Sequence, residues 1–270
     1  MNYKHYFPTY RRRYLFLFNA LQRLTIEYGS FKKILNLGAG EGDLNQLIQN
    51  YCDNIYACDV NKKDVEYGKS CNPSVIYSVQ DAADLNYKNE FFDIVICMEV
   101  LKHVKNIDKV LIEIERVMKP NGHTIITFPS NNFPVTYDPI NFIMKKNKFK
   151  FPIGAFAFGH SQLIDDKIFE KKVAALKLNV IVHKLLSYYL TGLVEMYWVG
   201  MGQKLFKSNS NNIELNKSYK SNLILRPQQN VVGKTPISDI VIKIDDALFE
   251  GISFRSIGSG YLIQKPKIKN

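Results

Sequence analysis

The sequence predicts an α/β fold built on a doubly wound, mostly parallel seven-stranded sheet. Between residues 31 and 130, short apolar runs alternate with amphipathic segments of helical period. The first apolar run leads directly into a glycine-rich loop, "GAGEG". The run "FFDIVICM" is apolar on both faces, as the centre of a parallel sheet requires. Such alternation implies right-handed crossovers, with ligands bound beyond the carboxyl ends of the central strands.

The elements follow in a regular order. Strands are expected at 33–37, 54–60, 74–79, 91–98 and 123–130. Helices are expected at 43–51, at 61–70 with Asn61 as N-cap, and at 106–122, where "KPNG" signals a turn. A sixth strand is expected at 178–186, and the tail at 246–266 should supply a final antiparallel strand.

Four regions are predicted along the chain. Residues 1–30 form an N-terminal helical cap, and residues 31–130 form the ligand-binding core. Residues 131–220 form an acceptor-binding insert, or lid, with a helix. Residues 221–270 supply C-terminal strands that complete the sheet.

Composition and charge narrow the function classes. The chain has 270 residues, 46% of them hydrophobic, and a net charge of +11. No run suits a transmembrane helix, and the N-terminus lacks the apolar region of a secretory signal, so a cytoplasmic location is expected. The four cysteines form no C-x-x-C pair, and no metal site is predicted.

The charge is unevenly distributed between the core and the insert. Residues 31–130 hold 11 Lys and Arg against 14 Asp and Glu, whereas residues 141–220 hold 13 Lys against 5 Asp and Glu. The basic insert indicates either an anionic partner or a solvated lysine face. Within it, Leu185–Met201 combines aromatic and apolar residues, which suits either an anionic membrane interface on the inner membrane face or an ordinary buried helix.

The glycine loop selects among ligands. A dinucleotide site with G-x-G-x-x-G would place its third glycine at position 43, where this chain has Asp43. The P-loop pair Lys-Ser/Thr is also missing, and two carboxylates beside a pyrophosphate would repel it. Gly38, Gly40 and Gly42 therefore favour a ligand that lacks phosphate and carries positive charge, such as S-adenosylmethionine (SAM).

Two further carboxylates fit an adenosine. Asp59 ends the second strand, where a carboxylate can accept both ribose hydroxyls; the alternative is a helix cap, which Asn61 could provide instead. Asp81 follows the third strand, where it could read the adenine amino group while the backbone of Ala82 reaches a ring nitrogen. The alternative for Asp81 is simple turn formation.

Five segments follow one another along the chain: "ILNLGAGEGDL", "YACDV", "QDAADLNY", "FFDIVICMEVLKHV" and "VLIEIERVMKPNGHTIITFP". Together they resemble the Rossmann-like (class I) SAM-dependent methyltransferases, in particular the type 11 and UbiE/Coq5-like branch. The resemblance implies SAM as cofactor, contacted by Gly38, Ala39, Gly40, Gly42, Asp59, Val60, Asp81, Ala82, Met98, Glu99 and Val100. The chain departs from the family at Asn36, where an acid is usual; its amide can still accept a hydrogen bond from the cofactor ammonium.

Two histidines are candidates for acid–base chemistry. His103 follows the fourth strand on the expected acceptor face and could take a proton; it could equally orient the loop. His160 lies in the insert and could contact the acceptor or simply begin a helix.

The sequence thus predicts a methyltransferase acting by in-line displacement on a small-molecule, glycan or lipid-linked acceptor, at oxygen or nitrogen. The alternatives are an RNA or protein methyltransferase that uses the basic insert, and a non-catalytic SAM-fold binding protein. Nucleic acid is the less favoured partner because no separate RNA-binding module is evident. Neither the acceptor atom nor the oligomeric state follows from the sequence.

Overall fold

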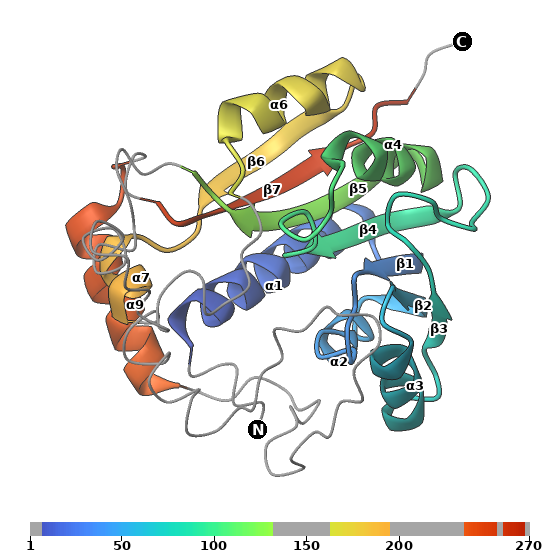
Figure 1. The fold of residues 1–270 in the computed structure, drawn as a ribbon, viewed down its shortest axis with the longest axis horizontal. Coiled ribbons are helices and arrows are strands. Elements are labelled where there is room, and N and C mark those ends of the chain that lie inside the picture. Colours follow the sequence, from blue (N-terminus) through green and yellow to red (C-terminus); the bar gives the residue numbers. More distant parts are fainter. Residues whose placement is uncertain (1–6, 132–162, 195–234, 253–255, 268–270) are drawn as a thin grey trace, which may run out of the picture.

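A computed structural model describes residues 7–131, 163–194, 235–252 and 256–267. A single seven-stranded sheet in the order β3-β2-β1-β4-β5-β7-β6 organises them (Figure 1). The strands are β1 Phe31–Leu37, β2 Cys52–Asp59, β3 Ile76–Val79, β4 Phe92–Met98, β5 Met118–Pro129, β6 Asn179–Leu185 and β7 Gly258–Gln264.

The pairing confirms the predicted fold class. Strands β1 to β5 pair in parallel, and β7 runs antiparallel to both β5 and β6. The central strand β4 buries Ile94, Val95, Ile96 and Cys97 completely, which explains its apolar character on both faces. The sheet order reverses between β1 and β4, so a ligand site is expected beyond the carboxyl ends of these two strands.

Helices cover both faces of the sheet (Figure 1). One core cluster packs α4 (Ile107–Val117) and α6 (Asp166–Ala175) on one face. The other packs α1 (Pro8–Tyr28) and α2 (Asn45–Ile48) on the opposite face. Helix α3 (Lys62–Cys71) contacts β2 and β3, and α9 (Pro236–Phe249) packs on α1 and α7 (Tyr189–Leu193).

Local signals explain several of these elements. Asn61 caps α3 by accepting a hydrogen bond from the Lys63 N–H at 3.1 Å, as predicted. Asn106 caps α4 in the same way through the Lys109 N–H. The apolar stripe of α4 buries Val110, Leu111 and Ile114.

Three predicted boundaries are wrong. Residues 221–270 do not supply strands alone, because 236–249 form α9 and the strand of the tail is confined to 258–264. The helix expected at 43–51 is a single turn, Asn45–Ile48, and "KPNG" lies within β5. The strand predicted at 178–186 is confirmed as β6, and it brings part of the insert into the main sheet. Among the described residues, no helix has the length and apolarity needed to cross a bilayer.

Candidate active site

The glycine loop joins β1 to α2 at the carboxyl edge of the sheet. Gly38, Gly40 and Gly42 have φ angles of +70°, +53° and +86°, which lie in the left-handed region that only glycine adopts readily. The N–H groups of Gly38 and Ala39 both donate to the Cys58 carbonyl at 2.9 Å. The loop is therefore tied to the end of β2, where Asp59 lies.

Asp59 anchors the glycine loop by hydrogen bonds and can still accept further ones. Its Oδ2 accepts from the Gly40 N–H at 2.8 Å, and its Oδ1 accepts from the Asn61 N–H at 2.9 Å. A carboxylate oxygen has two lone pairs, so each oxygen retains one acceptor position. This side chain is half-buried. It can accept ribose hydroxyls while it fixes the loop, and Asn61, not Asp59, caps α3.

The space at the three glycines differs. A Cβ on Gly38 would overlap Val100 Cγ2, and one on Gly42 would overlap the Tyr77 hydroxyl. A Cβ on Gly40 would meet no atom of the described residues within 4 Å. Two glycines thus allow close packing inside the protein, and the third faces open space at the carboxyl edge. A cofactor that approaches the backbone there is consistent with this open cradle.

Asn36 lies beneath the loop in a buried chain of amides. Its Nδ2 donates to Asn45 Oδ1 at 2.7 Å, and Asn45 Nδ2 donates to the Tyr77 hydroxyl at 2.8 Å. Asn36 is 2% exposed and Asn45 is fully buried. The amide of Asn36 is therefore oriented by Asn45, an arrangement that sequence reasoning missed because Asn45 and Tyr77 belong to no motif.

Asp81 and Ala82 follow β3 in a tight turn. Asp81 Oδ1 accepts from the Ala83 N–H at 2.9 Å, and the Asp81 carbonyl accepts from the Asp84 N–H at 3.0 Å. This is the turn-forming role that the sequence left open. Asp81 is exposed, so its second oxygen stays accessible, whereas Ala82 is 7% exposed.

The segment after β4 is held by ion pairs. Glu99, at φ +61°, pairs with Arg13 Nε of α1 at 2.9 Å and with Lys102 Nζ at 3.2 Å. Its Oε1 also accepts from Thr127 Oγ1 at 3.0 Å. The Glu99 carboxylate is thus occupied by protein partners, and Arg13 is a site residue that no sequence motif marked.

His103 lies four residues after Glu99, in a turn. Its backbone N–H donates to the Val100 carbonyl at 2.9 Å. Burial and then the Lys102 charge lower the His103 pKa below its usual value, against the opposing effects of Glu99 and Asp59. A neutral imidazole near these two carboxylates can accept a proton at neutral pH. Val60, Met98 and Val100 also lie along this edge, with Val60 55% exposed. His160 lies outside the described residues.

Residues 35–126 match the model of a methyltransferase domain. The ubiquinone biosynthesis O-methyltransferase of Rickettsia canadensis is 28% identical over 113 residues, covering 40% of this chain and 48% of that protein. The ubiquinone/menaquinone biosynthesis C-methyltransferase UbiE of Hydrogenovibrio crunogenus is 31% identical over 102 residues, covering 34% of this chain and 40% of that protein. The chain spans about half the length, or less, of these curated relatives.

Two solved structures show the same fold. The [4+2]-cyclase SpnF aligns with a TM-score of 0.60 at 14% identity, covering 93% of this chain and 80% of that one. A putative sarcosine dimethylglycine methyltransferase from Galdieria sulphuraria aligns with a TM-score of 0.58 at 14% identity, covering 93% and 86%. The match identifies residues 35–126 as a methyltransferase domain, and the two solved structures share the fold of this chain.

Proposed function

We propose that this chain transfers a methyl group from SAM to an oxygen or nitrogen of a small-molecule acceptor, a class that includes free glycans and lipid-linked sugars. One observation carries the proposal: an open glycine cradle at Gly40 is hydrogen-bonded to Asp59, a carboxylate with spare acceptor positions. When bound, SAM supplies an activated methyl group for in-line displacement by the acceptor atom.

The chain's own residues supply positioning and proton removal. The glycine loop would lie under the methionine part, Asp59 would accept the ribose hydroxyls, and the turn at Asp81–Ala82 would contact adenine. Asn36 would accept from the cofactor ammonium. His103, with its lowered pKa, would take the proton of an acceptor hydroxyl.

The names of the curated relatives support a small acceptor. Both are named for quinone biosynthesis, one as an O-methyltransferase and one as a C-methyltransferase. The fold alone does not decide the reaction, because one structural neighbour is named a cyclase. We therefore infer the small-molecule class of acceptor from these relatives, and experiment decides between oxygen and nitrogen as the methylated atom.

The cofactor part is tested by calorimetry with S-adenosylhomocysteine (SAH). Asp59→Ala should weaken binding by roughly 1–3 kcal/mol, since charged hydrogen bonds are lost. Asp53→Ala is the matched control, because Asp53 lies exposed at the opposite end of the same strand. Equal affinity in the wild type and Asp59→Ala would contradict the ribose assignment.

The acceptor part is tested with methyl-labelled SAM and fractionated cell extract. Label should enter the small-molecule or lipid fraction and require His103. Label in RNA or protein would contradict the acceptor class. Bound SAM with no transfer to any fraction would support a non-catalytic binding protein instead.

We also propose a cytoplasmic location in which residues 185–201 do not attach the protein to a membrane. In the described part of 185–201, Leu186, Tyr188 and Thr191 are at most 4% exposed, which supports a buried segment over an interfacial one. Sedimentation with anionic and neutral vesicles at low salt tests this. Salt-sensitive binding to anionic vesicles alone would favour peripheral membrane contact and a lipid-linked acceptor.

A further inference from the structure

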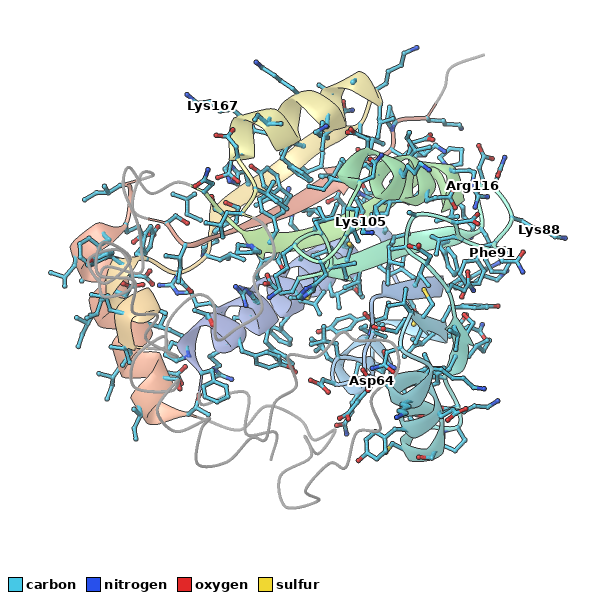
Figure 2. The ribbon with its side chains drawn as sticks, viewed as in Figure 1. Asp64, Lys88, Phe91, Lys105, Arg116 and Lys167 are labelled. Carbon is cyan, nitrogen blue, oxygen red and sulfur yellow. The ribbon has the colours of Figure 1, made fainter. Side chains whose placement is uncertain are left out.

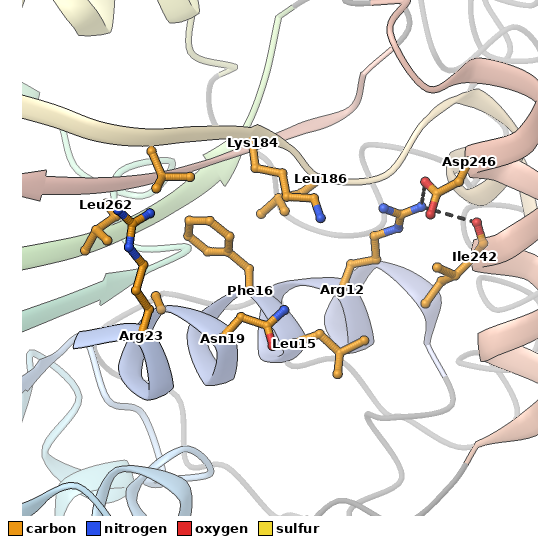
Figure 3. Close-up of a pocket in the computed structure, with 12 residues that line it drawn as sticks. Arg12, Leu15, Phe16, Asn19, Arg23, Lys184, Leu186, Ile242, Asp246 and Leu262 are labelled. Carbon is orange, nitrogen blue, oxygen red and sulfur yellow. Dashed lines mark hydrogen bonds and ion pairs between the residues drawn. The ribbon is translucent and has the colours of Figure 1, made fainter. Parts of the chain in front are cut away.

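A cavity of about 370 Å³ lies between α1, the strands β6 and β7, and α9 (Figure 3). Its volume is at the small end of the range for ligand pockets. It contains none of the glycine-loop residues and not Asp59. It lies over the β7–β6 end of the sheet, whereas the cofactor edge belongs to β1, β2 and β4.

The walls of this cavity carry excess positive charge. Arg12, Arg23 and Lys184 line it, against the single carboxylate of Asp246. Among the described residues, Asp246 pairs with Arg12, and neither Arg23 nor Lys184 has an ion pair. The cavity is therefore complementary to an anion.

Arg12 makes this more than a surface lysine patch. The residue is 8% exposed, and its hydrogen bonds in the described part of the chain both use Nη2, to Asp246 and to the Ile242 carbonyl (Figure 3). Its Nε is buried and has no hydrogen-bond partner among the residues that the structure describes. A guanidinium has five N–H donors, and the hydrogen bonds within the described part of the chain use only those of Nη2. Because this Nε is closed off from the cavity, the guanidinium acts on a ligand there mainly through its positive charge.

The remaining walls are apolar. Phe16, Leu186 and Leu262 are at most 7% exposed, belong to the α1-side core and also line the cavity. Leu15 and Val182, both half-buried, also line the cavity. A ligand that only neutralised the cations would leave the apolar walls unfilled.

We propose that this cavity is a second binding site, for a small anionic amphiphile with an oxyanion head and an apolar body. The head lies near Lys184 and Arg12, and the body lies against Phe16 and Leu262, towards Arg23 at the other end of the cavity (Figure 3). Carboxylates and phosphate monoesters share this chemistry, and the test below separates them.

The test is calorimetric titration of the full chain with octyl phosphate and octanoate, in the presence of saturating SAH. Octyl phosphate, octanoate or both should bind, and the tighter of the two identifies the head group. Octyltrimethylammonium should not bind, and inorganic phosphate should bind at least tenfold more weakly than octyl phosphate. Binding of the cation, or equal binding of inorganic phosphate, would overturn the proposal, as would failure of both amphiphiles to bind.

The matched variants change charge without disturbing the core. Arg23 and Lys184 are exposed, so Arg23→Gln/Lys184→Gln should fold normally and weaken binding about tenfold. Lys167→Gln/Lys171→Gln removes the same charge from α6, on the opposite face of the sheet (Lys167 in Figure 2), and should leave affinity within twofold. Equal losses in both double variants would show general electrostatic attraction and refute the site.

Discussion

Replacing Gly38 by alanine tests whether the packing of the glycine loop against Val100 is as tight as the structure indicates. Gly38 has φ +70°, and an added Cβ would overlap Val100 Cγ2 and lie 3.3 Å from Val100 Cβ. Both the backbone and the neighbouring side chain therefore resist the change. Gly251 provides the matched control, because it has φ +86° and its added Cβ would meet no atom within 4 Å in the described parts of the chain.

The two costs can be separated. An L-residue in the left-handed region costs about 1–2 kcal/mol, and both variants should lose this amount. Overpacking typically adds about 1–3 kcal/mol, and only Gly38→Ala should lose it. The expected decrease in the free energy of unfolding is therefore about 2–5 kcal/mol for Gly38→Ala and about 1–2 kcal/mol for Gly251→Ala.

Urea unfolding followed by circular dichroism measures both free energies of unfolding, provided that their slope against urea concentration (the m-value) is the same in both variants. Val100→Ala in the Gly38→Ala background should recover part of the loss, because it removes the overlapping methyl groups. Equal destabilisation of the two glycine variants, or no recovery from Val100→Ala, would refute the packing argument.

Three further predictions follow from the site and its surroundings. Gly40→Ala should lower SAH affinity at least tenfold in calorimetry while stability falls by only about 1–2 kcal/mol, because its Cβ faces open space; unchanged affinity would contradict the cradle. His103→Ala should lower turnover about 10²–10⁴-fold with cofactor affinity unchanged, and wild-type activity should fall as pH drops through the lowered His103 pKa; near-normal turnover would make His103 structural. The Arg116 hydrogen bond lowers the Glu113 pKa, so its stabilisation should be present above the unfolded value of about 4.3 and be lost as pH falls through the folded pKa. Glu113→Gln should flatten that acid-side change in thermal unfolding, and an unaltered pH profile would contradict the assignment.

The sheet could be predicted because its signals are local. Apolar runs of strand length, the cap at Asn61 and the glycine spacing each lie within about ten residues of sequence. The helix α9 could not be predicted from the sequence, because its segment is rich in isoleucine, which favours strands. Tertiary contacts decide the outcome: Ile242 is 9% exposed, and fully buried Asp245 accepts from the backbone N–H groups of Tyr188 and Thr191.

Some residues of the candidate site could likewise be predicted from local sequence, and others could not. Asp59 and the glycine loop follow from spacing, and the structure brings them within hydrogen-bond distance. Glu99 was assigned to the cofactor by resemblance, yet its carboxylate binds Arg13, Lys102 and Thr127. Ion pairs between distant segments depend on the packing of α1 across the sheet, and no local pattern encodes that packing.

The run Arg11-Arg12-Arg13 shows what such packing accomplishes. Successive residues of a helix point about 100° apart, so three adjacent arginines cannot share one partner. Arg11 pairs with Asp239 and Arg12 with Asp246, both on α9, whereas Arg13 pairs with Glu99 beyond β4. A charge run that resembles a solvated surface in sequence thus fixes α1 to α9 on one side and to the cofactor edge on the other. Arg12 and Arg13 therefore connect the proposed second site and the candidate active site through one turn of a single helix.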